Sequence, residues 1–355
     1  MIKEFASILI NETASVKDAM KQLDKTAEKI LFVIKDDNIL VGSLTDGDIR
    51  RWILKEGSLA EKVREVCFKG TYSVNLNYNL EAVKEEILKR KIIFVPVLDD
   101  DNRIEEFLIW DKLFDGKIKR KTKGKFDIPV VIMAGGKGTR LDPLTRILPK
   151  PLIPIGDKSI LELIIEKFTD YQVDHFYISI HHKAKIIKSY FEELQPEYSL
   201  TFLYEDKPLG TIGALKQLQG KIEGNILLTN CDIIIQADYS DLLKHHIENS
   251  NDITIVASLK NYNIPYGICE IENGGALVGI NEKPEYDFLV NTGMYIINSE
   301  LIKYIPVNEF FHITHLIKEV QKLGKRISVY PISENSWIDT GEWVEYKNAV
   351  EKLKL

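Results

Sequence analysis

A cluster of glycines and cations follows an apolar run near the middle of the chain. Residues 128–133 have the length and composition of a buried parallel strand, and the next segment reads Gly135-Gly136-Lys137-Gly138-Thr139-Arg140. Glycines let backbone N–H groups crowd around an anion, because they lack a side chain and tolerate left-handed dihedral angles. Arg140 and Lys137 add positive charge, and Lys150 follows in a Pro-Lys-Pro stretch with a restricted backbone. These residues predict a polyphosphate site.

The glycine spacing separates this loop from the two common nucleotide loops. The dinucleotide fingerprint G-x-G-x-x-G fails at Leu141, and no stretch of the sequence supplies the P-loop pattern. An ordinary tight turn is the remaining local alternative. Residues 133–154 resemble, without a gap, the signature of the sugar-1-phosphate nucleotidylyltransferases, which make nucleotide sugars. This resemblance implies that the nucleotide is bound by Met133, Gly135, Gly136, Lys137, Gly138, Thr139 and Arg140.

Two aspartates follow predicted strands later in the chain. Asp232 comes just after the apolar residues 225–229, and Asp339 ends a short apolar run. Polyphosphate chemistry uses a hard divalent cation held by one or two carboxylates, and Mg²⁺ fits that role. The resemblance implies that Asp232 and Asp339 hold the metal and are catalytic together with Arg140 and Lys150. Cys231 departs from the family pattern, which usually has glycine at that position.

Further segments resemble the base-binding and sugar-binding parts of the family. Residues 205–214 include Glu205, Gly210 and Thr211; we expect Gly210 to let ligand approach the backbone and Thr211 to cap the following helix as well as touch ligand. By resemblance, Glu282 accepts hydrogen bonds from sugar hydroxyls and Lys283 neutralises the sugar phosphate. The complete set implied for the sugar phosphate is Tyr266, Gly267, Glu282, Lys283, Asn291 and Thr292.

The implied reaction is transfer of a nucleoside monophosphate. A phosphate oxygen of the sugar-1-phosphate attacks the α-phosphorus of an NTP in line, and pyrophosphate leaves. GTP is favoured, because residues 208–211 (Pro-Leu-Gly-Thr) look like the guanylyl branch and Glu205 can accept hydrogen bonds from a base. CTP, UTP and dTTP remain alternatives, and the sugar can be glucosamine, mannose or a heptose. The alternative of another class is a non-catalytic nucleotide-sensing module.

Residues 1–114 contain one motif twice, over about residues 1–57 and 58–114. Each copy has a helical stretch followed by two strands, at 15–29, 30–34 and 39–44 and again at 79–89, 92–98 and 104–110. This pair resembles a CBS-domain tandem, which implies that Thr45 and Asp48 hold the ribose of a regulatory adenine nucleotide. The second copy has Trp110 where the threonine is expected. The pair serves regulation or only assembly, and we expect a homo-oligomer, a dimer or higher.

The basic residues 115–127 predict a solvated linker, since six of the nine residues 117–125 are lysine or arginine. From residue 128 to 355, strands alternate with helices, as expected for an α/β protein with a doubly wound, mostly parallel, Rossmann-like sheet that has helices on both faces. Expected helices include 160–168, 184–194, 211–218 and 343–353. The paired histidines, such as His245-His246, lack a third ligand at zinc spacing and are expected to pack or to be solvated.

The composition excludes several classes of protein. The 355 residues are enough for two or three domains, and 45% of them are hydrophobic and 28% charged, as in ordinary soluble globular proteins. The net charge of −6 argues against general affinity for nucleic acid or anionic membranes. No apolar run approaches the ~20 residues of a membrane span. The three cysteines have no metal or disulfide spacing, so we expect reduced thiols in a cytoplasmic protein.

Overall fold

The computed structural model describes residues 2–26, 30–90, 92–109, 126–332 and 334–353. The chain divides into two compact units, Met1–Lys121 and Thr122–Leu355, and each is described by itself. The expected linker lies almost entirely outside the described residues, and so does Trp110. Among the residues that the structure describes, no helix is long and apolar enough to cross a membrane.

The N-terminal unit consists of two small sheets with the same topology. In each sheet the first strand pairs with the second in parallel and the second pairs with the third antiparallel. The first sheet has β1 (Leu9–Asn11), β2 (Ile30–Lys35) and β3 (Ile39–Thr45). The 3₁₀-helix η1 (Ile2–Ile8) precedes this sheet, and α2 (Asp46–Leu54) follows it. Helix α1 (Val16–Thr26) connects β1 to β2, and η2 (Asp36–Asn38) connects β2 to β3. The second has β4 (Val74–Asn75), β5 (Phe94–Leu98) and β6 (Ile104–Ile109), with α3 (Val63–Val66) before it and α4 (Leu80–Arg90) between β4 and β5.

An aromatic cluster joins the two small sheets. Phe32 from the first sheet and Phe94 and Phe107 from the second belong to one buried core, together with Phe5. The ring centroids of Phe32 and Phe107 are 4.9 Å apart, and those of Phe5 and Phe107 are 5.1 Å apart. The two copies of the motif therefore share a hydrophobic core.

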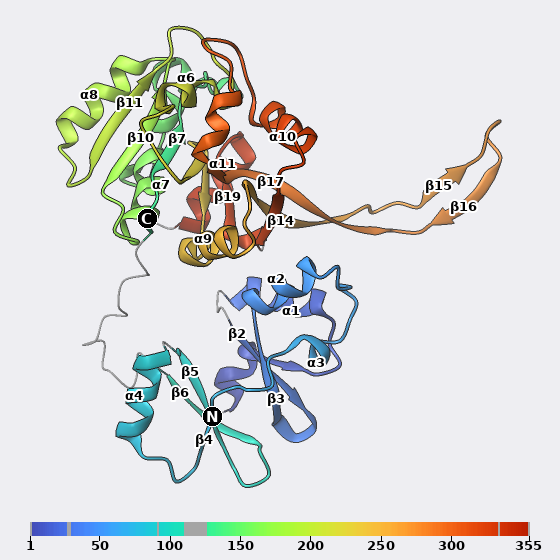
Figure 1. Ribbon diagram of the computed structural model, residues 1–355. Coiled ribbons are helices and arrows are strands. Elements are labelled where there is room, and N and C mark those ends of the chain that lie inside the picture. The colour runs from blue at the N-terminus through green and yellow to red at the C-terminus, as the bar shows by residue number, and fades with distance from the viewer. Residues whose placement is uncertain (1, 27–29, 91, 110–125, 333, 354–355) are drawn as a thin grey trace. The chain divides into compact units, whose positions relative to one another are not determined.

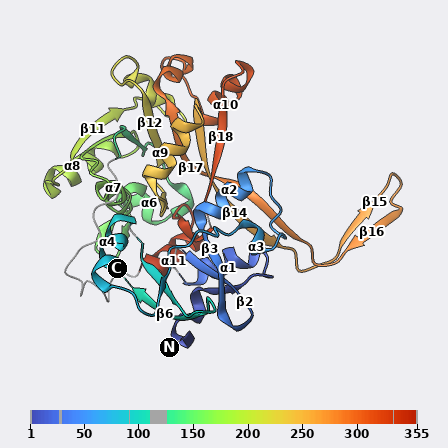
Figure 2. The same ribbon diagram turned by 60° about the horizontal axis from the view of Figure 1, so that its bottom comes forward.

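The second unit is built on a seven-stranded sheet with the order β11-β10-β7-β12-β17-β14-β18, whose strands are labelled between the two views (Figures 1 and 2). All of its strands run in the same direction except β17, which is antiparallel to both of its neighbours. The strands are β7 (Val130–Met133), β10 (His175–Ile180), β11 (Ser199–Tyr204), β12 (Asn225–Asn230), β14 (Ile253–Asn263), β17 (Glu285–Asn298) and β18 (Ile327–Ile332). The helices are α6 (Leu144–Ile147), α7 (Ile160–Thr169), α8 (Ala184–Leu194), α9 (Tyr239–Glu248), α10 (Ile313–Lys322) and α11 (Trp343–Leu353).

Both faces of this sheet are buried. Val130 and Ile132 of β7 belong to one core, which includes residues of α7, α8, α9 and α11. Val131 and Met133 point the other way, into a core that includes residues of η5 (Gly213–Leu218), η6 (Ser299–Tyr304) and α10. A strand covered on both faces reads as a continuous apolar run, which is why the sequence predicts β7 correctly. The expected doubly wound, mostly parallel sheet is confirmed.

Short elements complete the second unit. They are β8 (Pro154–Ile155), β9 (Lys158–Ser159), β13 (Ile233–Ile235), β19 (Trp337–Asp339), η3 (Thr139–Leu141), η4 (Lys150–Leu152) and η7 (Glu334–Ser336). β13 pairs with β19 antiparallel, outside the main sheet. Helix α7 begins with a capping box, in which Ser159 and Glu162 each accept a hydrogen bond from the other's backbone N–H, at 3.3 and 2.8 Å.

One feature is not expected from the sequence. Strands β14 and β17 continue beyond the sheet as a two-stranded ribbon that ends in β15 (Ile268–Ile271) and β16 (Leu277–Asn281), and this ribbon projects away from the sheet in both views (Figures 1 and 2). We call residues 260–288 the arm. Because β15 and β16 form a separate two-stranded sheet, the arm has no third strand among the described residues.

Candidate active site

The glycine loop follows β7 at the carboxyl end of the sheet. Gly138 has a φ of +69°, and a Cβ there would lie 2.9 Å from the Cβ of Lys150 and 3.0 Å from the Cγ2 of Thr145. Gly138 therefore allows the loop to pack closely against Lys150. Gly136 differs, because a Cβ there would have no neighbour within 4 Å. The loop thus keeps one side open, and the exposed side chains of Lys137, Thr139 and Arg140 follow it.

Glu205 lies beside this loop in a buried position. A Cβ on Gly135 would come within 2.7 Å of its Oε1. The Ser179 hydroxyl donates a hydrogen bond to Oε1, and the backbone N–H of Leu209 donates to Oε2 at 2.9 Å. The carboxylate therefore holds the segment after β11 against β10, next to the glycine loop. Sequence reasoning missed Ser179, because a serine in an apolar strand gives no distinctive signal.

The segment after Glu205 is fixed by contacts with residues 311–313. Gly210 has a φ of +80°, and a Cβ there would lie 2.6 Å from the carbonyl oxygen of Phe311, so the close approach at Gly210 is between two protein backbones. Thr211 does not cap the next helix, which is a 3₁₀-helix that begins at Gly213 with Ile212 as its N-cap residue. The Thr211 hydroxyl accepts instead from the N–H of Ile313, at the start of α10, at 2.9 Å. The expected helix at 211–218 is therefore wrong in type and start.

Three charged side chains from distant parts of the chain meet beyond the ends of β12 and β19. The Lys150 Nζ lies 2.5 Å from the Asp232 Oδ2, and these side chains are only 8% and 19% exposed. Asp339 accepts the N–H of Gly341 on Oδ1 at 2.6 Å. Pairing of β13 with β19 places Ile233 opposite Asp339, and the N–H and hydroxyl of Thr340 both donate to the carbonyl of Asp232 at 2.8 and 2.9 Å.

Gly341 lies among these charges. A Cβ there would be 2.9 Å from the Asp339 Oδ1 and 3.5 Å from both the Asp232 Oδ2 and the Lys150 Nζ. Burial and the neighbouring charge of Asp232 raise the pKa of Asp339, while Lys150 and the Gly341 N–H act in the opposite direction. Two carboxylates and one ammonium group leave one unbalanced negative charge in a partly buried position. Such an arrangement attracts a cation.

Arg140 lies at the exposed side of the same region. Its Nη1 is 3.0 Å from the Glu342 Oε1, and this hydrogen bond is the main cause of the raised pKa of Arg140. Two-thirds of the Arg140 side chain is exposed. Glu342, Thr340 and Gly341 were not assigned roles from the sequence, although they directly follow Asp339.

The residues expected at the sugar phosphate fall into two places. Tyr266, Gly267, Glu282 and Lys283 lie on the arm, where a Cβ on Gly267 would come within 2.7 Å of the Glu282 Oε2. Asn291 and Thr292 lie on β17. There the buried Thr292 hydroxyl donates to the carbonyl of Val256 at 2.8 Å, and the Asn291 Nδ2 donates to the Tyr295 hydroxyl at 2.7 Å.

The donor set around Asp232 suits a hard divalent cation. Mg²⁺ is usually held by one or two carboxylates together with substrate phosphates and waters. Within the described residues, no group of three or more histidine, cysteine or carboxylate side chains forms a complete cage. Asp232 and Asp339 therefore fit a metal that shares its remaining positions with a phosphate.

A pocket of about 490 Å³ reaches Asp339 from the side of α11. Trp337, Lys260 and Glu345 also line it. The Trp337 Nε1 and the Glu345 Oε2 are both buried, and neither has a hydrogen-bond partner among the described residues. This pocket thus offers one donor and one acceptor beside Asp339, which the sequence did not indicate.

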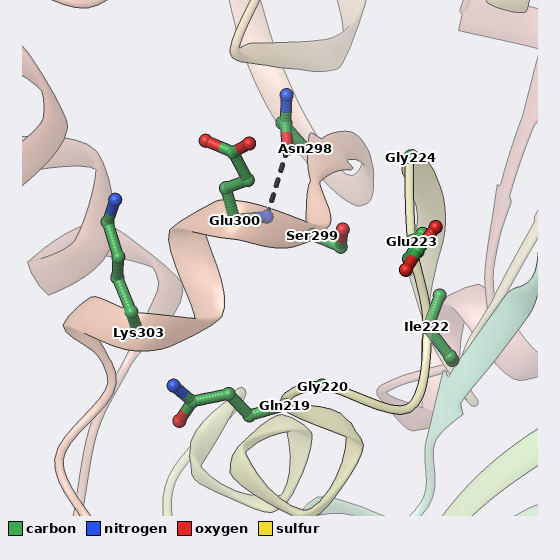
Figure 3. A pocket seen from close by; sticks show the side chains of 9 residues that line it. All are labelled: Gln219, Gly220, Ile222, Glu223, Gly224, Asn298, Ser299, Glu300 and Lys303. Carbon is green, nitrogen blue, oxygen red and sulfur yellow. Dashed lines mark hydrogen bonds between the residues drawn. The ribbon is translucent and has the colours of Figure 1, made fainter.

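A second pocket, of about 540 Å³, lies at the opposite end of β12 (Figure 3). It is bounded by residues 219–224 and the start of η6, where the Glu300 N–H donates to the Asn298 Oδ1 at 2.9 Å. Because β12 begins at Asn225 and Asp232 follows its other end, this pocket is separate from the candidate active site.

Comparison with known proteins agrees with this geometry. A family model described as "Nucleotidyl transferase" matches residues 129–354. The chain belongs to the nucleotidyl transferase family. A second model, described as "CBS domain", matches residues 2–55, which contain the first small sheet.

Several relatives of the nucleotidyl transferase unit carry more specific names. The chain is 29% identical over 241 residues to a UTP–glucose-1-phosphate uridylyltransferase of Synechocystis sp., with 62% of each chain covered. It is 27% identical to a D-glycero-alpha-D-manno-heptose 1-phosphate guanylyltransferase of Campylobacter jejuni, over 61% of this chain and 96% of the relative. The crystal structure of HddC from Yersinia pseudotuberculosis matches with a TM-score of 0.51 and 27% identity, over 64% of this chain and 99% of HddC. The match to the Synechocystis protein thus spans about three-fifths of that protein's length.

Proposed function

We propose that this chain is a sugar-1-phosphate guanylyltransferase. It transfers GMP from GTP to a hexose- or hexosamine-1-phosphate, such as glucosamine- or mannose-1-phosphate, and releases pyrophosphate and a GDP-sugar. The observation that carries the proposal is the convergence of Lys150, Asp232 and Asp339 beside a glycine loop, in a chain of the nucleotidyl transferase family. A place in bacterial surface-sugar biosynthesis, in the cytoplasm where nucleotides are made, fits this reaction.

The triphosphate binds at the glycine loop in this proposal. The backbone N–H groups of Gly135, Gly136 and Gly138, with the side chains of Lys137, Thr139 and Arg140, surround its phosphates. Lys150 stabilises the charge that develops at the α-phosphorus. The nucleophile is a phosphate oxygen that is already anionic, so no general base is needed, and catalysis consists of alignment and charge neutralisation.

Asp232 and Asp339 would hold Mg²⁺ in the proposed enzyme. When bound, the metal neutralises charge on the phosphates and helps to orient them. The short Lys150–Asp232 pair keeps one carboxylate in place in the absence of ligand. Glu342 restrains the Arg140 guanidinium on the exposed side of the site.

The base and the sugar phosphate are assigned to two separate sets of residues. Met133, Glu205, Gly210 and Thr211 form the base side, where the fixed carboxylate of Glu205 can accept from guanine N–H groups through its remaining lone pairs. The sugar phosphate is assigned to Tyr266, Gly267, Glu282, Lys283, Asn291 and Thr292. The Campylobacter relative is named a guanylyltransferase and the Synechocystis relative a uridylyltransferase, so UTP is the main competitor of GTP.

The N-terminal unit is proposed to be a CBS pair over residues 1–114, joined by a linker at 115–127 to the transferase at 128–355. Thr45 and Asp48 form a capping box at the start of α2, in which the Asp48 Oδ2 accepts from the N–H and the hydroxyl of Thr45 at 2.9 and 2.7 Å. The Asp48 Oδ1 also pairs with Arg51 at 2.6 Å. A nucleotide ribose would therefore bind to groups that the fold has already ordered, and an adenine nucleotide is the expected ligand.

The deciding experiment measures pyrophosphate release with Mg²⁺ over a grid of four NTPs and several sugar-1-phosphates. We expect turnover with GTP and one hexose- or hexosamine-1-phosphate. Preference for UTP would replace the guanylyl assignment and keep the reaction class. If folded protein released no pyrophosphate with any pair of substrates, the nucleotide-sensing alternative would be favoured. AMP or ATP added to the same assay tests the CBS pair, which regulates only if the rate changes.

A further inference from the structure

The tip of the arm has one apolar face and one polar face. Strand pairing places Cys269 opposite Ile280 and Ile271 opposite Leu277. Cross-strand partners share a face, and so do residues two apart in one strand, so these four side chains lie together. Ile271, Leu277 and Ile280 are 66%, 58% and 60% exposed, and Cys269 is also exposed. We call these four residues the apolar face of the arm.

The other face of the tip carries two polar side chains, Glu270 and Asn281, together with Ile268 and Gly279. Glu270 is paired with Gly279, and Ile268 with Asn281, so Glu270 and Asn281 point away from the apolar face. A two-faced ribbon of this kind normally buries its apolar side against another layer. Here the apolar side is exposed, as the polar side is.

A second apolar cluster lies nearer the sheet on the same arm. Tyr262 is paired with Tyr286, and Lys260 with Phe288, so the three aromatic rings share a face. The Tyr286 and Phe288 rings stack with centroids 6.1 Å apart, and the Tyr262 ring is 6.0 Å from that of Phe288. All three side chains are exposed.

Within the described part of the chain, the tip of the arm lacks the third strand or packed layer that normally stabilises a two-stranded ribbon. A two-stranded ribbon alone is at best marginally stable in water, and no arm residue belongs to a buried core of the described chain. Contiguous exposed apolar side chains of this kind mark an interaction surface. The question is what covers them.

We propose that a second copy of this chain covers the apolar face, with the apolar faces of two arms packed against each other about a two-fold axis. None of the four residues of that face is charged, so two identical faces meet without like-charge repulsion. Residues 261–282 include three glutamates and no lysine or arginine, which disfavours a nucleic acid or an anionic membrane as the occupant. In a two-fold contact the same patch of each copy faces the other, so two ribbons of equal length cover each other's apolar faces.

The natural cysteines provide a direct test. Cys269 is exposed on the apolar face, whereas Cys67 and Cys231 are buried, so a short bis-maleimide reacts selectively at position 269. We expect wild-type protein at micromolar concentration to give a covalent dimer and Cys269→Ser to give none. In the Cys269→Ser background, Glu270→Cys moves the thiol to the polar face, and we expect at least tenfold less covalent dimer.

A pair of matched charge variants tests the packing itself. Ile280→Asp adds a carboxylate to the apolar face, and Asn281→Asp adds the same charge to the next residue, on the opposite face. We expect Ile280→Asp to lower the cross-linking yield at Cys269 at least tenfold and Asn281→Asp to leave it within twofold of wild type. Both positions are exposed, so neither change disturbs a buried core.

Three results would overturn the proposal. One is a wild-type chain whose Cys269 takes up a monofunctional maleimide but never cross-links. Another is equal cross-linking from Cys269 and from the Glu270→Cys thiol, and the third is equal yields from Ile280→Asp and Asn281→Asp. Cross-linking locates the contact at the arm even if the N-terminal unit also associates. Because the assay contains no substrate, its outcome is independent of whether the guanylyltransferase assignment is correct.

Discussion

The two ends of strand β12 carry buried polar groups of opposite kinds. At the start of the strand, His246 lies 3.2 Å from the Asn225 Oδ1 through Nε2 and 2.8 Å from the Thr254 hydroxyl through Nδ1. The Asn251 Nδ2 donates to the hydroxyls of Thr254 and Ser328 at 3.2 and 2.6 Å. Beyond the other end lie Asp232 and its charged neighbours. One cluster is a neutral hydrogen-bond network, and the other is a set of charges.

Burial shifts the pKa of one side chain in each cluster, in opposite directions and with different consequences. It lowers the pKa of His246 to about 4, so this side chain stays neutral inside a network that satisfies both of its ring nitrogens. Burial and a like charge raise the pKa of Asp339, which nevertheless remains among charged groups. Buried charges cost more than buried neutral groups unless they are fully paired. We infer that the neutral cluster maintains the fold and that the charged cluster is kept for a ligand.

The strongest test of this distinction is Asp232→Asn. We expect turnover to fall at least about a hundredfold, because the carboxylate pair proposed to hold the cation is broken. Stability should change by about 1 kcal/mol or less, since Lys150 retains Asp339 as a neighbour and one carboxylate repulsion is removed. Pyrophosphate release and thermal unfolding measure the two quantities. Asp157→Asn, at an exposed position in the same unit, is the control, and equal losses of activity and stability would refute the assignment.

Glu205 combines features of the neutral and the charged cluster, because its side chain is a carboxylate and both of its oxygens accept hydrogen bonds from the protein. Glu205→Gln preserves the shape; its amide oxygen can accept from Leu209 N–H, and its NH₂ can donate to the Ser179 hydroxyl. We expect stability within about 1 kcal/mol of wild type but a tenfold or larger loss in kcat/KM for GTP, since a carboxylate accepts more strongly than an amide. The ratio of kcat/KM for GTP and UTP is the measurement. An unchanged ratio would remove Glu205 from base recognition.

The neutral cluster should respond in the reverse way. His246→Ala leaves Thr254 and Asn225 without a ring partner and opens a cavity, so we expect a loss of about 2–3 kcal/mol in unfolding free energy. Turnover at 25 °C should remain within twofold of wild type. Denaturant unfolding and the pyrophosphate assay give the two values, with the half-buried neighbour His245→Ala as the comparison. A large loss of turnover without loss of stability would reverse the roles of the two ends.

The sequence predicts the helices and strands better than the tertiary contacts between them. Helices α8 and α11 match their expected bounds, and β7 and α7 differ by one or two residues, because apolar periodicity is a local property. The glycine loop and the two aspartates expected to hold the metal are also predicted from local motifs. The contact of Lys150 with Asp232 spans 82 residues and depends on strand order, which no local pattern encodes.

The errors also have physical causes. Residues 211–218 have helical spacing, but only 213–218 form a helix, of the 3₁₀ type, because the Phe311 carbonyl accepts from the Ile212 N–H and the Ile313 N–H donates to the Thr211 hydroxyl. The arm is missed because its apolar side chains are exposed, so the usual relation between apolar alternation and a buried face fails there. The conformation of such segments is determined by tertiary packing or by a partner.

The smallest expected effect concerns pH and isolates His246. The pKa of His246 in the folded protein, about 4, is below the ordinary value of about 6.5. Between these pH values the unfolded chain therefore binds a proton that the folded chain does not bind. Stability is therefore undiminished above pH 6.5 and falls as the pH is lowered from 6.5 toward 4, by about 1 kcal/mol at pH 5.5. His246→Gln keeps a polar side chain without titrating, and Asp252 and His245, its ionisable neighbours, remain in both proteins. The difference between the two unfolding free energies should shrink as the pH falls from 7.5 to 5.5, and a constant difference would show that folding does not lower the pKa of His246.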